Sequence, residues 1–220
     1  MVVVKYWCPT GNNTARAVAF CALMLAWAGS VYAQGGDPEE ALRDRLEGLD
    51  GIIAEFEQQV TSPRGVVIEQ SSGTLYLLKP AFRWDVDDPY PQTILAREGV
   101  VHVYDPDLEQ VTERALDDSL DQAPLALLTR SNLALSDYFK IVQLGSQPDV
   151  DRFELYPTGS DSLFARMQLV FDGRTLSALV IYDHVGQQTL VRFADYEPGQ
   201  VIQSDVFEMR YPPDTDFVRG

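Results

Sequence analysis

The chain has 220 residues, of which 33 are acidic and 17 are basic, so its formal net charge at neutral pH is −16. This length fits one domain or at most two. A chain this acidic is a poor nucleic-acid binder, because phosphate contacts require clustered Lys and Arg side chains. Anionic lipid surfaces would also repel the chain as a whole. Because 45% of its residues are hydrophobic, we expect a globular protein with a core of its own.

The first 33 residues have the pattern of a secretory signal peptide. Lys5 and Arg16 precede an apolar run at 17–28 that is too short to span a bilayer as a stable helix. Val31 and Ala33 place small residues at the −3 and −1 positions of a signal-peptidase site. We therefore predict cleavage of residues 1–33 and a single domain over 34–220.

Cleavage at this point would change the chemistry of the chain. Both cysteines, Cys8 and Cys21, would leave with the signal peptide, and the net charge would fall to −18 because Lys5 and Arg16 leave too. The exported chain would then have no disulfide, no thiol nucleophile and no cysteine metal site. We expect an acidic, soluble, exported protein that is stabilised by its core alone.

The exported part opens with a helix. Asp37 is a good N-cap, Pro38 suits the first turn, and two acids follow at the positive end of the helix dipole. Apolar residues then recur at helical spacing, at Leu42, Leu46, Leu49 and Ile53. This pattern predicts an amphipathic helix over about 38–50.

From residue 52 the apolar period changes from about 3.6 to 2, which predicts strands. The alternation places them at 52–60, 73–79, 82–86, 93–97, 100–104 and 110–115. A helical interlude follows at 123–128 and 133–139. Strands resume at 141–144, 152–156, 163–171, 176–183, 188–196 and 205–209.

This order predicts an α+β fold of about eleven strands. Tight hairpin signals at Glu98-Gly99 and Asp172-Gly173 indicate antiparallel neighbours. Many consecutive short strands favour one large curved antiparallel sheet with helices over its apolar face.

Catalytic and metal-binding motifs are not apparent in the sequence. The two histidines, His102 and His184, lie in or beside strands, and zinc would need further ligands that the spacing does not supply. G-x-S-x-G and glycine-rich phosphate loops are absent from the sequence. A convergent carboxylate pair stays possible. We expect no enzymatic activity, no metal and no cofactor.

The apolar strand residues are more informative. Seven of them share the period of 2 and are expected to line the concave face of the sheet: Phe56, Leu75, Leu77, Phe82, Trp84, Val103 and Val111. The pattern is compatible with a filled core and with a cavity for hydrophobic ligands. Periodicity alone leaves both interpretations open.

Five stretches resemble the LolA family of periplasmic outer-membrane lipoprotein carrier proteins. They are FEQQV at 56–60, GTLYLLKPAFRW at 73–84, YDPDLEQVT at 104–112, APLALL at 123–128 and FEMRYP at 207–212. The resemblance implies a half-open, incomplete β-barrel with a lid of helices over a hydrophobic cavity. It also implies that the cavity takes lipoprotein acyl chains from an inner-membrane ABC-type release complex and passes them to an outer-membrane lipoprotein receptor. Such a carrier works as a monomer.

The same resemblance assigns roles to particular residues. The cavity would include Leu46 and Leu49 of the first helix and Leu125 and Leu128 of the interlude, besides the strand residues. In the family, a basic residue before the strand-ending proline, usually arginine, holds the lid through main-chain groups. Lys79 stands at that position and would face Leu46, Leu128 and Thr129. The residues before Cys21 form a poor lipobox, so the soluble carrier fits better than the lipidated receptor.

Two other functions remain open at this point. One is an exported lipid-binding sensor or regulatory domain on a similar half-barrel, whose ligand is a signal and not cargo. The other is a periplasmic hydrolase with unrecognised carboxylates. Copurification of lipoprotein would favour the carrier. Enzymatic turnover that is lost when one acidic residue is replaced, without loss of folding, would favour the hydrolase.

Overall fold

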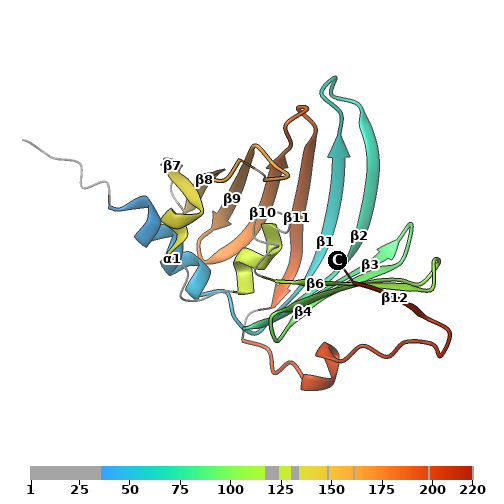
Figure 1. Cartoon of the computed structure of the whole chain (residues 1–220). Helices are drawn as coiled ribbons and strands as arrows, with labels where there is room; N and C mark the ends of the chain where they lie inside the picture. Colours follow the sequence, from blue (N-terminus) through green and yellow to red (C-terminus); the bar gives the residue numbers. More distant parts are fainter. Residues whose placement is uncertain are drawn as a thin grey trace, which may run out of the picture. The chain divides into compact units, whose positions relative to one another are not determined.

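The protein is built on one open, strongly curved sheet of twelve strands (Figure 1). The computed structural model describes residues 36–116, 124–129, 134–147, 149–160, 162–197 and 199–219. The predicted signal peptide lies outside the described residues, as do Ala123 and Leu133 at the edges of the predicted interlude helices.

The sheet consists of two meanders joined by one long-range pairing. The strand order is β12-β6-β5-β4-β3-β2-β1-β11-β10-β9-β8-β7. The first meander contains β1 (Ile52–Thr61), β2 (Val67–Leu78), β3 (Ala81–Asp88), β4 (Gln92–Arg97), β5 (Val100–Asp105) and β6 (Gln110–Ala115). The second contains β7 (Phe139–Gln147), β8 (Val150–Pro157), β9 (Arg166–Asp172), β10 (Thr175–Tyr182) and β11 (Gln188–Glu197).

The sheet thus has twelve strands and not about eleven. The strands β1 to β11 pair antiparallel, as the sequence predicts, but the last strand was missed. The C-terminal β12 (Asp216–Arg219) pairs parallel with β6. The strand predicted at 205–209 is wrong, because this segment forms the 3-10 helix η4 (Ser204–Phe207) and then irregular backbone. The predicted start of β2 at 73 was also too late, since the first half of the strand, 67–72, has two adjacent apolar residues followed by four polar ones and so shows no alternation.

The first helix, α1 (Pro38–Glu47), starts where the sequence predicts. The Asp37 carboxylate accepts a hydrogen bond of 3.0 Å from the backbone N–H of Glu39, which satisfies one unpaired donor of the first turn. The helix ends at Glu47 and not at 50, with Gly48 as its C-cap. The predicted interlude helices are short 3-10 segments, η2 (Pro124–Thr129) and η3 (Leu135–Asp137).

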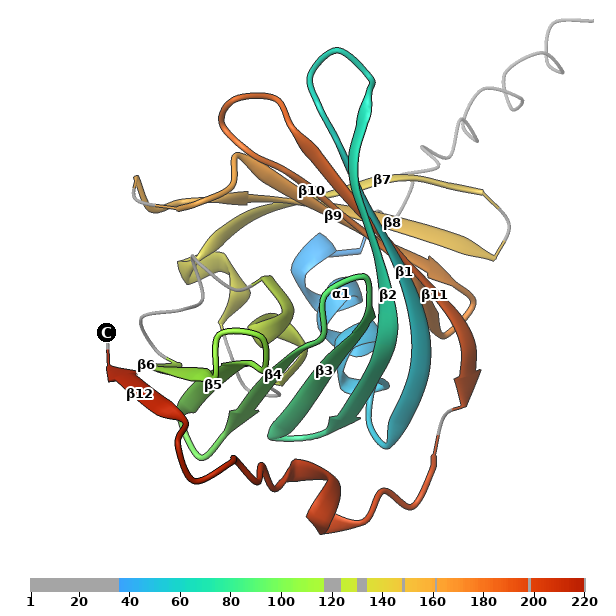
Figure 2. The same cartoon turned by 90° about the vertical axis from the view of Figure 1, so that its right-hand side faces the viewer.

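The main core lies between the concave face of the sheet and these helical segments. Figure 2 shows α1 inside the curve of the sheet. Leu42 and Leu46 of α1 and Leu127 and Leu128 of η2 belong to one buried cluster with the apolar strand residues. The face of α1 that carries Leu42 and Leu46 is therefore buried, as their spacing predicts, whereas Leu49 follows the helix and Ile53 lies in β1 and packs in another cluster.

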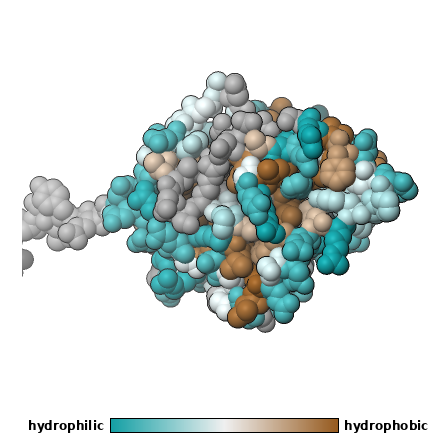
Figure 3. All heavy atoms as spheres, turned by 60° about the horizontal axis from the view of Figure 1, so that its bottom comes forward, coloured by the Kyte–Doolittle hydropathy of each residue, from teal (hydrophilic) through white to brown (hydrophobic). Residues whose placement is uncertain are grey.

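The C-terminal segment covers the opposite, convex face. Its residues Ile202 and Phe207 pack with Leu95 in a second, smaller apolar cluster. On the side of the molecule that carries this segment, hydrophobic side chains gather between hydrophilic ones (Figure 3).

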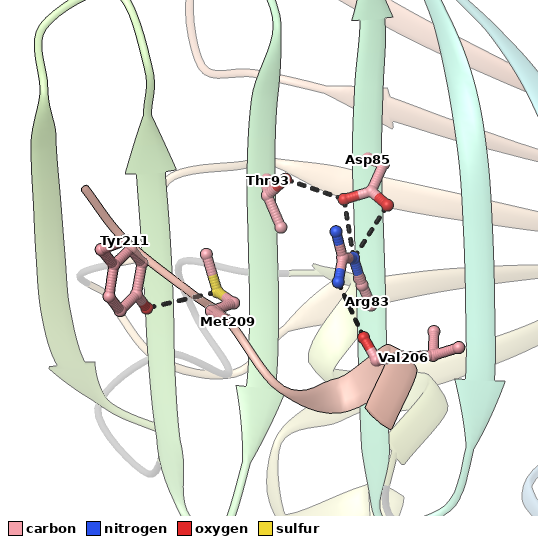
Figure 4. Close-up of polar contacts among 6 residues, drawn as sticks. All are labelled: Arg83, Asp85, Thr93, Val206, Met209 and Tyr211. Carbon is pink, nitrogen blue, oxygen red and sulfur yellow. Dashed lines mark hydrogen bonds and ion pairs between the residues drawn. The ribbon is translucent and has the colours of Figure 1, made fainter. Parts of the chain in front are cut away.

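Two arginines of the sheet hold this segment in place. Arg83 is oriented by Asp85, with its Nε 2.8 Å from Oδ2, and donates from Nη1 to the carbonyl of Val206 at 2.8 Å (Figure 4). Arg97 donates to the carbonyl of Phe207 at 3.2 Å. These bonds take up carbonyl groups of η4, so this apolar segment packs as a turn and does not join the sheet as a strand.

Gly73 allows β2 and β3 to approach closely at the centre of the concave face. A Cβ atom at this position would lie 1.8 Å from the carbonyl oxygen of Asp85 and 3.0 Å from the ring of Phe56. The pairing of β2 with β3 shifts register at Ser72 and Gly73, next to this contact. Only glycine fits here without moving the backbone.

We expect Gly73→Ala to lower the free energy of unfolding by about 3 kcal/mol, the upper end of overpacking costs, because β3 must move. The matched control is Gly145→Ala in β7, where nothing lies within 4 Å of the added methyl group. Denaturant unfolding of both variants measures the difference. Equal stability of the two variants would show that the sheet absorbs the added Cβ.

Candidate functional site

A small apolar cavity lies where α1 ends above the junction of the two meanders. Its volume is about 10 Å³, room for roughly one water molecule. Its wall comes from the end of α1, from β1, β2 and η2, and from β10 and β11: Leu49, Ile52, Ala54, Leu75, Leu77, Leu128, Leu176, Phe193 and Tyr196. The predicted hydrophobic cavity is thus a small gap in a packed core in this structure.

Most of the residues predicted for the cavity lie in this core. Leu49, Leu75, Leu77 and Leu128 line the gap itself. Four others belong to the same buried cluster: Leu46, Phe56, Phe82 and Trp84. Val103 is half-buried and packs against it, while the side chain of Leu125 lies outside the described residues.

Val111 is a correction to the predicted site. It is fully buried, but it stands opposite Tyr104, whereas Val103 stands opposite Thr112. Directly paired residues point to the same side of a sheet, so Val111 and Val103 face opposite sides. Val111 therefore faces the convex side, and Phe217 of β12 is its neighbour in the sheet.

The second meander supplies wall residues that the sequence analysis missed. Leu176, Phe193 and Tyr196 come from β10 and β11. Burial raises the pKa of Tyr196 to about 12, which agrees with its apolar surroundings. Their apolar alternation was visible in the sequence, but nothing in it indicated that β11 lies beside β1.

Three aromatic rings connect the meanders next to the cavity. Phe56 and Trp84 stack with their ring centroids 3.7 Å apart, and Trp84 meets Phe193 edge to face at 6.1 Å. Phe56 also stands opposite both Gly73 and Phe193 in the sheet. Such ring contacts add stability beyond the area that they bury, so the rings make a rigid floor beside the gap.

Lys79 contacts the end of α1. Its Nζ donates to the carbonyl of Leu46 at 2.5 Å, and its backbone N–H donates to the carboxylate of Asp50 at 2.9 Å. Burial lowers the pKa of the Lys79 ammonium, against the attraction of Asp50 and Glu47. A cation at the last carbonyls of a helix is favourable, so Lys79 fastens the C-terminal end of α1 to the end of β2.

Arg45 is a second fastener of α1 that the sequence did not indicate. Its guanidinium donates to the carbonyl of Gly173 at 2.7 Å and forms an ion pair with Asp151. These partners lie on the β9–β10 turn and on β8. Lys79 therefore connects the C-terminal end of α1 to the first meander, and Arg45 connects the same end to the second.

The lining of this site is apolar. Among the described residues, no group of three or more His, Cys, Asp or Glu side chains is placed to hold a metal ion. Within the same ranges no helix is long and apolar enough to cross a membrane. The cavity wall offers hydrocarbon surface only, and Tyr196 contributes to it with its apolar atoms.

Comparison with known proteins places this arrangement in a family. The family model described as outer membrane lipoprotein carrier protein LolA matches residues 47–210. The chain is 34% identical to the outer-membrane lipoprotein carrier protein of Chromohalobacter salexigens, over 86% of this chain and 90% of that one. The chain belongs to the LolA family.

Another relative is similar over most of its length, and two solved structures share the fold. The chain is 30% identical to the carrier protein of Pseudomonas aeruginosa, over 91% of this chain and 96% of that one. An uncharacterised conserved protein from Thermus thermophilus shares the fold, with a TM-score of 0.55 at 15% identity, over 84% of this chain and 100% of that one. A LolA superfamily protein from Nitrosomonas europaea does so with a TM-score of 0.50 at 12% identity, over 79% and 99%.

We expect Arg45→Met to lower the free energy of unfolding by about 1 kcal/mol, since the pair is partly exposed, and to increase the binding of an apolar fluorescent dye. The control is Arg43→Met, whose ion pair with Glu39 stays within the helix and is worth only about 0.5 kcal/mol. If the two variants unfold alike and bind equal amounts of dye, Arg45 does not fasten α1.

Proposed function

We propose that the protein is a periplasmic carrier of lipoproteins. It is exported through residues 1–33 as a cleaved signal peptide. It takes the acyl chains of lipoproteins from an inner-membrane ABC-type release complex and hands them to a receptor on the outer membrane. Membership of the family whose relatives bear the name lipoprotein carrier is the observation that carries this proposal.

The physical need for such a carrier is large. Each methylene taken out of water is worth about 0.8 kcal/mol, so one chain of roughly sixteen carbons contributes on the order of 10 kcal/mol when buried. A lipoprotein whose acyl chains are exposed to water does not cross an aqueous space at that cost in free energy. A carrier needs only shielded apolar surface for this task, and neither catalysis nor a cofactor.

The packed core supports a carrier that opens. A gap of about 10 Å³ does not hold an acyl chain, so α1 and η2 act as a lid that must leave the concave face. The apolar surface that they cover when the carrier is empty is the surface that the acyl chain covers when it is loaded. Lid and cargo therefore compete, and this competition lowers the net affinity enough for release.

Lys79 is the lid latch in this proposal. Its bond to the carbonyl of Leu46 exists only while α1 is in place, so it stabilises the empty state and not the loaded one. A hydrogen bond from a charged group is worth about 1.5 kcal/mol, roughly tenfold in an equilibrium constant. Leu128 and Thr129, buried in η2, belong to the same lid.

An exported lipid sensor is the alternative function, because the same apolar core would also suit a signalling lipid. The two functions differ in what occupies the core. A carrier holds whole lipoproteins through their acyl chains. A sensor holds free lipid.

Mass spectrometry of molecules that copurify from the periplasm tests both the function and the latch. We expect lipoproteins with the wild type, and several-fold more with Lys79→Leu, because the competing empty state is weakened. The matched control is Lys140→Leu, which removes an exposed lysine of β7 and should behave as the wild type.

Two outcomes contradict parts of this account. Free fatty acids or phospholipids in place of lipoproteins would favour the sensor. Equal lipoprotein occupancy of all three proteins would leave the carrier function intact and remove Lys79 as its latch.

A further inference from the structure

Two hairpin turns project together from one end of the sheet, at the top of Figures 1 and 2. They connect β1 with β2 and β10 with β11. The strands β1 and β11 stay paired up to Thr61 and Gln188, and Pro63 lies 3.6 Å from the Cβ position of Gly186. The two turns therefore form one projecting unit.

A third connection joins this unit. The segment between β8 and β9 lies beside the β10–β11 turn, because His184 Nε2 is 2.8 Å from the carbonyl oxygen of Ser162. We call the three connections the apex, comprising residues 62–68, 162–165 and 183–187. It lies at the end of β1 and β2 that is remote from α1 and Lys79.

The apex exposes an unusual amount of apolar side chain. Of ten large hydrophobic residues that are exposed in the described part of the chain, five belong to it. Their exposed fractions are 59% for Val66, 45% for Val67, 56% for Ile68, 61% for Leu163 and 77% for Val185. Exposed apolar residues gathered from separate loops are typical of an interaction surface.

The charge of the apex differs from that of the rest of the chain. Between Glu57 and Glu69 the sequence has one charged residue, the exposed Arg64, although acids outnumber basic residues 33 to 17 overall. In the neighbouring turn, the Asp183 carboxylate accepts backbone hydrogen bonds from Val185 and Gln187 at 2.9 and 2.8 Å. The exposed Glu69 borders the apex on β2.

We propose that the apex is a membrane-contacting element, in which the apolar residues enter the interfacial layer of a bilayer and Arg64 meets lipid phosphate. The combination of exposed aliphatic side chains with a basic residue fits that layer, which is apolar below and anionic above. The acidic remainder of the protein is repelled by the same surface. The contact is therefore weak and orients the molecule with this end toward the lipid.

A flat lipid surface fits the apex better than an extended peptide does. The pairing of β2 with β3 begins only at Ser72, so the edge of β2 at 67–71 could accept a peptide strand. Such a peptide would lie along Val67 and Ile68 and leave Leu163 and Val185 uncovered. A bilayer surface reaches all three connections together.

Vesicle sedimentation without any lipoprotein tests the proposal separately from the carrier function. The probes are vesicles of phosphatidylethanolamine with phosphatidylglycerol, and vesicles of phosphatidylcholine alone. The test variant is Val66→Ser with Ile68→Ser. Its matched control is Leu108→Ser with Val201→Ser, which removes two exposed apolar residues elsewhere, 68% and 92% exposed.

We expect the wild type and the control to bind both kinds of vesicle weakly, and the apex variant to lose several-fold in binding to both. Arg64→Glu should lose more binding on the vesicles that contain phosphatidylglycerol, whose surface is net anionic, than on phosphatidylcholine, whose phosphates are balanced by choline. Absence of wild-type binding at low salt, or equal binding of all variants, overturns the proposal. So does an apex variant that binds vesicles normally but loses binding to a protein partner.

Discussion

The pairing of β1 with β11 is the contact on which the rest of the structure depends. It runs from Ile53 opposite Glu197 to Thr61 opposite Gln188 and joins two meanders that are otherwise separate runs of hairpins. A slip of one residue would turn the apolar set of one meander to the convex side. In the observed register, Phe56 meets Phe193, and both meanders contribute to one concave apolar face.

The concave apolar face must be shielded from water by the helical segments. A sheet with a curved apolar face needs cover, and here two short segments, α1 and η2, contribute to it. α1 is tied down at one end by Lys79 and Arg45, each to a different meander. In the carrier that we propose, a cover held by a few polar bonds is stable when the core is empty and is replaced when an acyl chain binds.

The sequence predicted what depends on local order. The cap of α1 at Asp37, the antiparallel hairpins of the two meanders and most of the core residues follow from spacing and turn residues. The side of the sheet that a residue faces was harder to predict. A period of 2 shows which residues of one strand share a side, but it does not show how two strands align. The turn at 106–109 sets Val111 opposite Tyr104, and this put Val111 on the convex side.

The sequence pattern could not predict contacts between segments that are far apart in the chain. Arg45 bonds to Asp151 and Gly173 more than a hundred residues away, and nothing near Arg45 in the chain signals this. The apolar residues of 205–209 have the pattern of a strand, yet Arg83 and Arg97 bind the carbonyls of η4. The role of Lys79 was suggested by family resemblance, and the structure adds its bond to the carbonyl of Leu46.

The central claim is that acyl chains replace α1 on the concave face. Hydrogen–deuterium exchange, with and without a synthetic triacylated lipopeptide, measures this directly. We expect the amides of α1 to exchange faster in the loaded protein, while those of β1 and β11 keep their protection. A lipopeptide that binds while α1 exchanges as slowly as in the empty protein would contradict it.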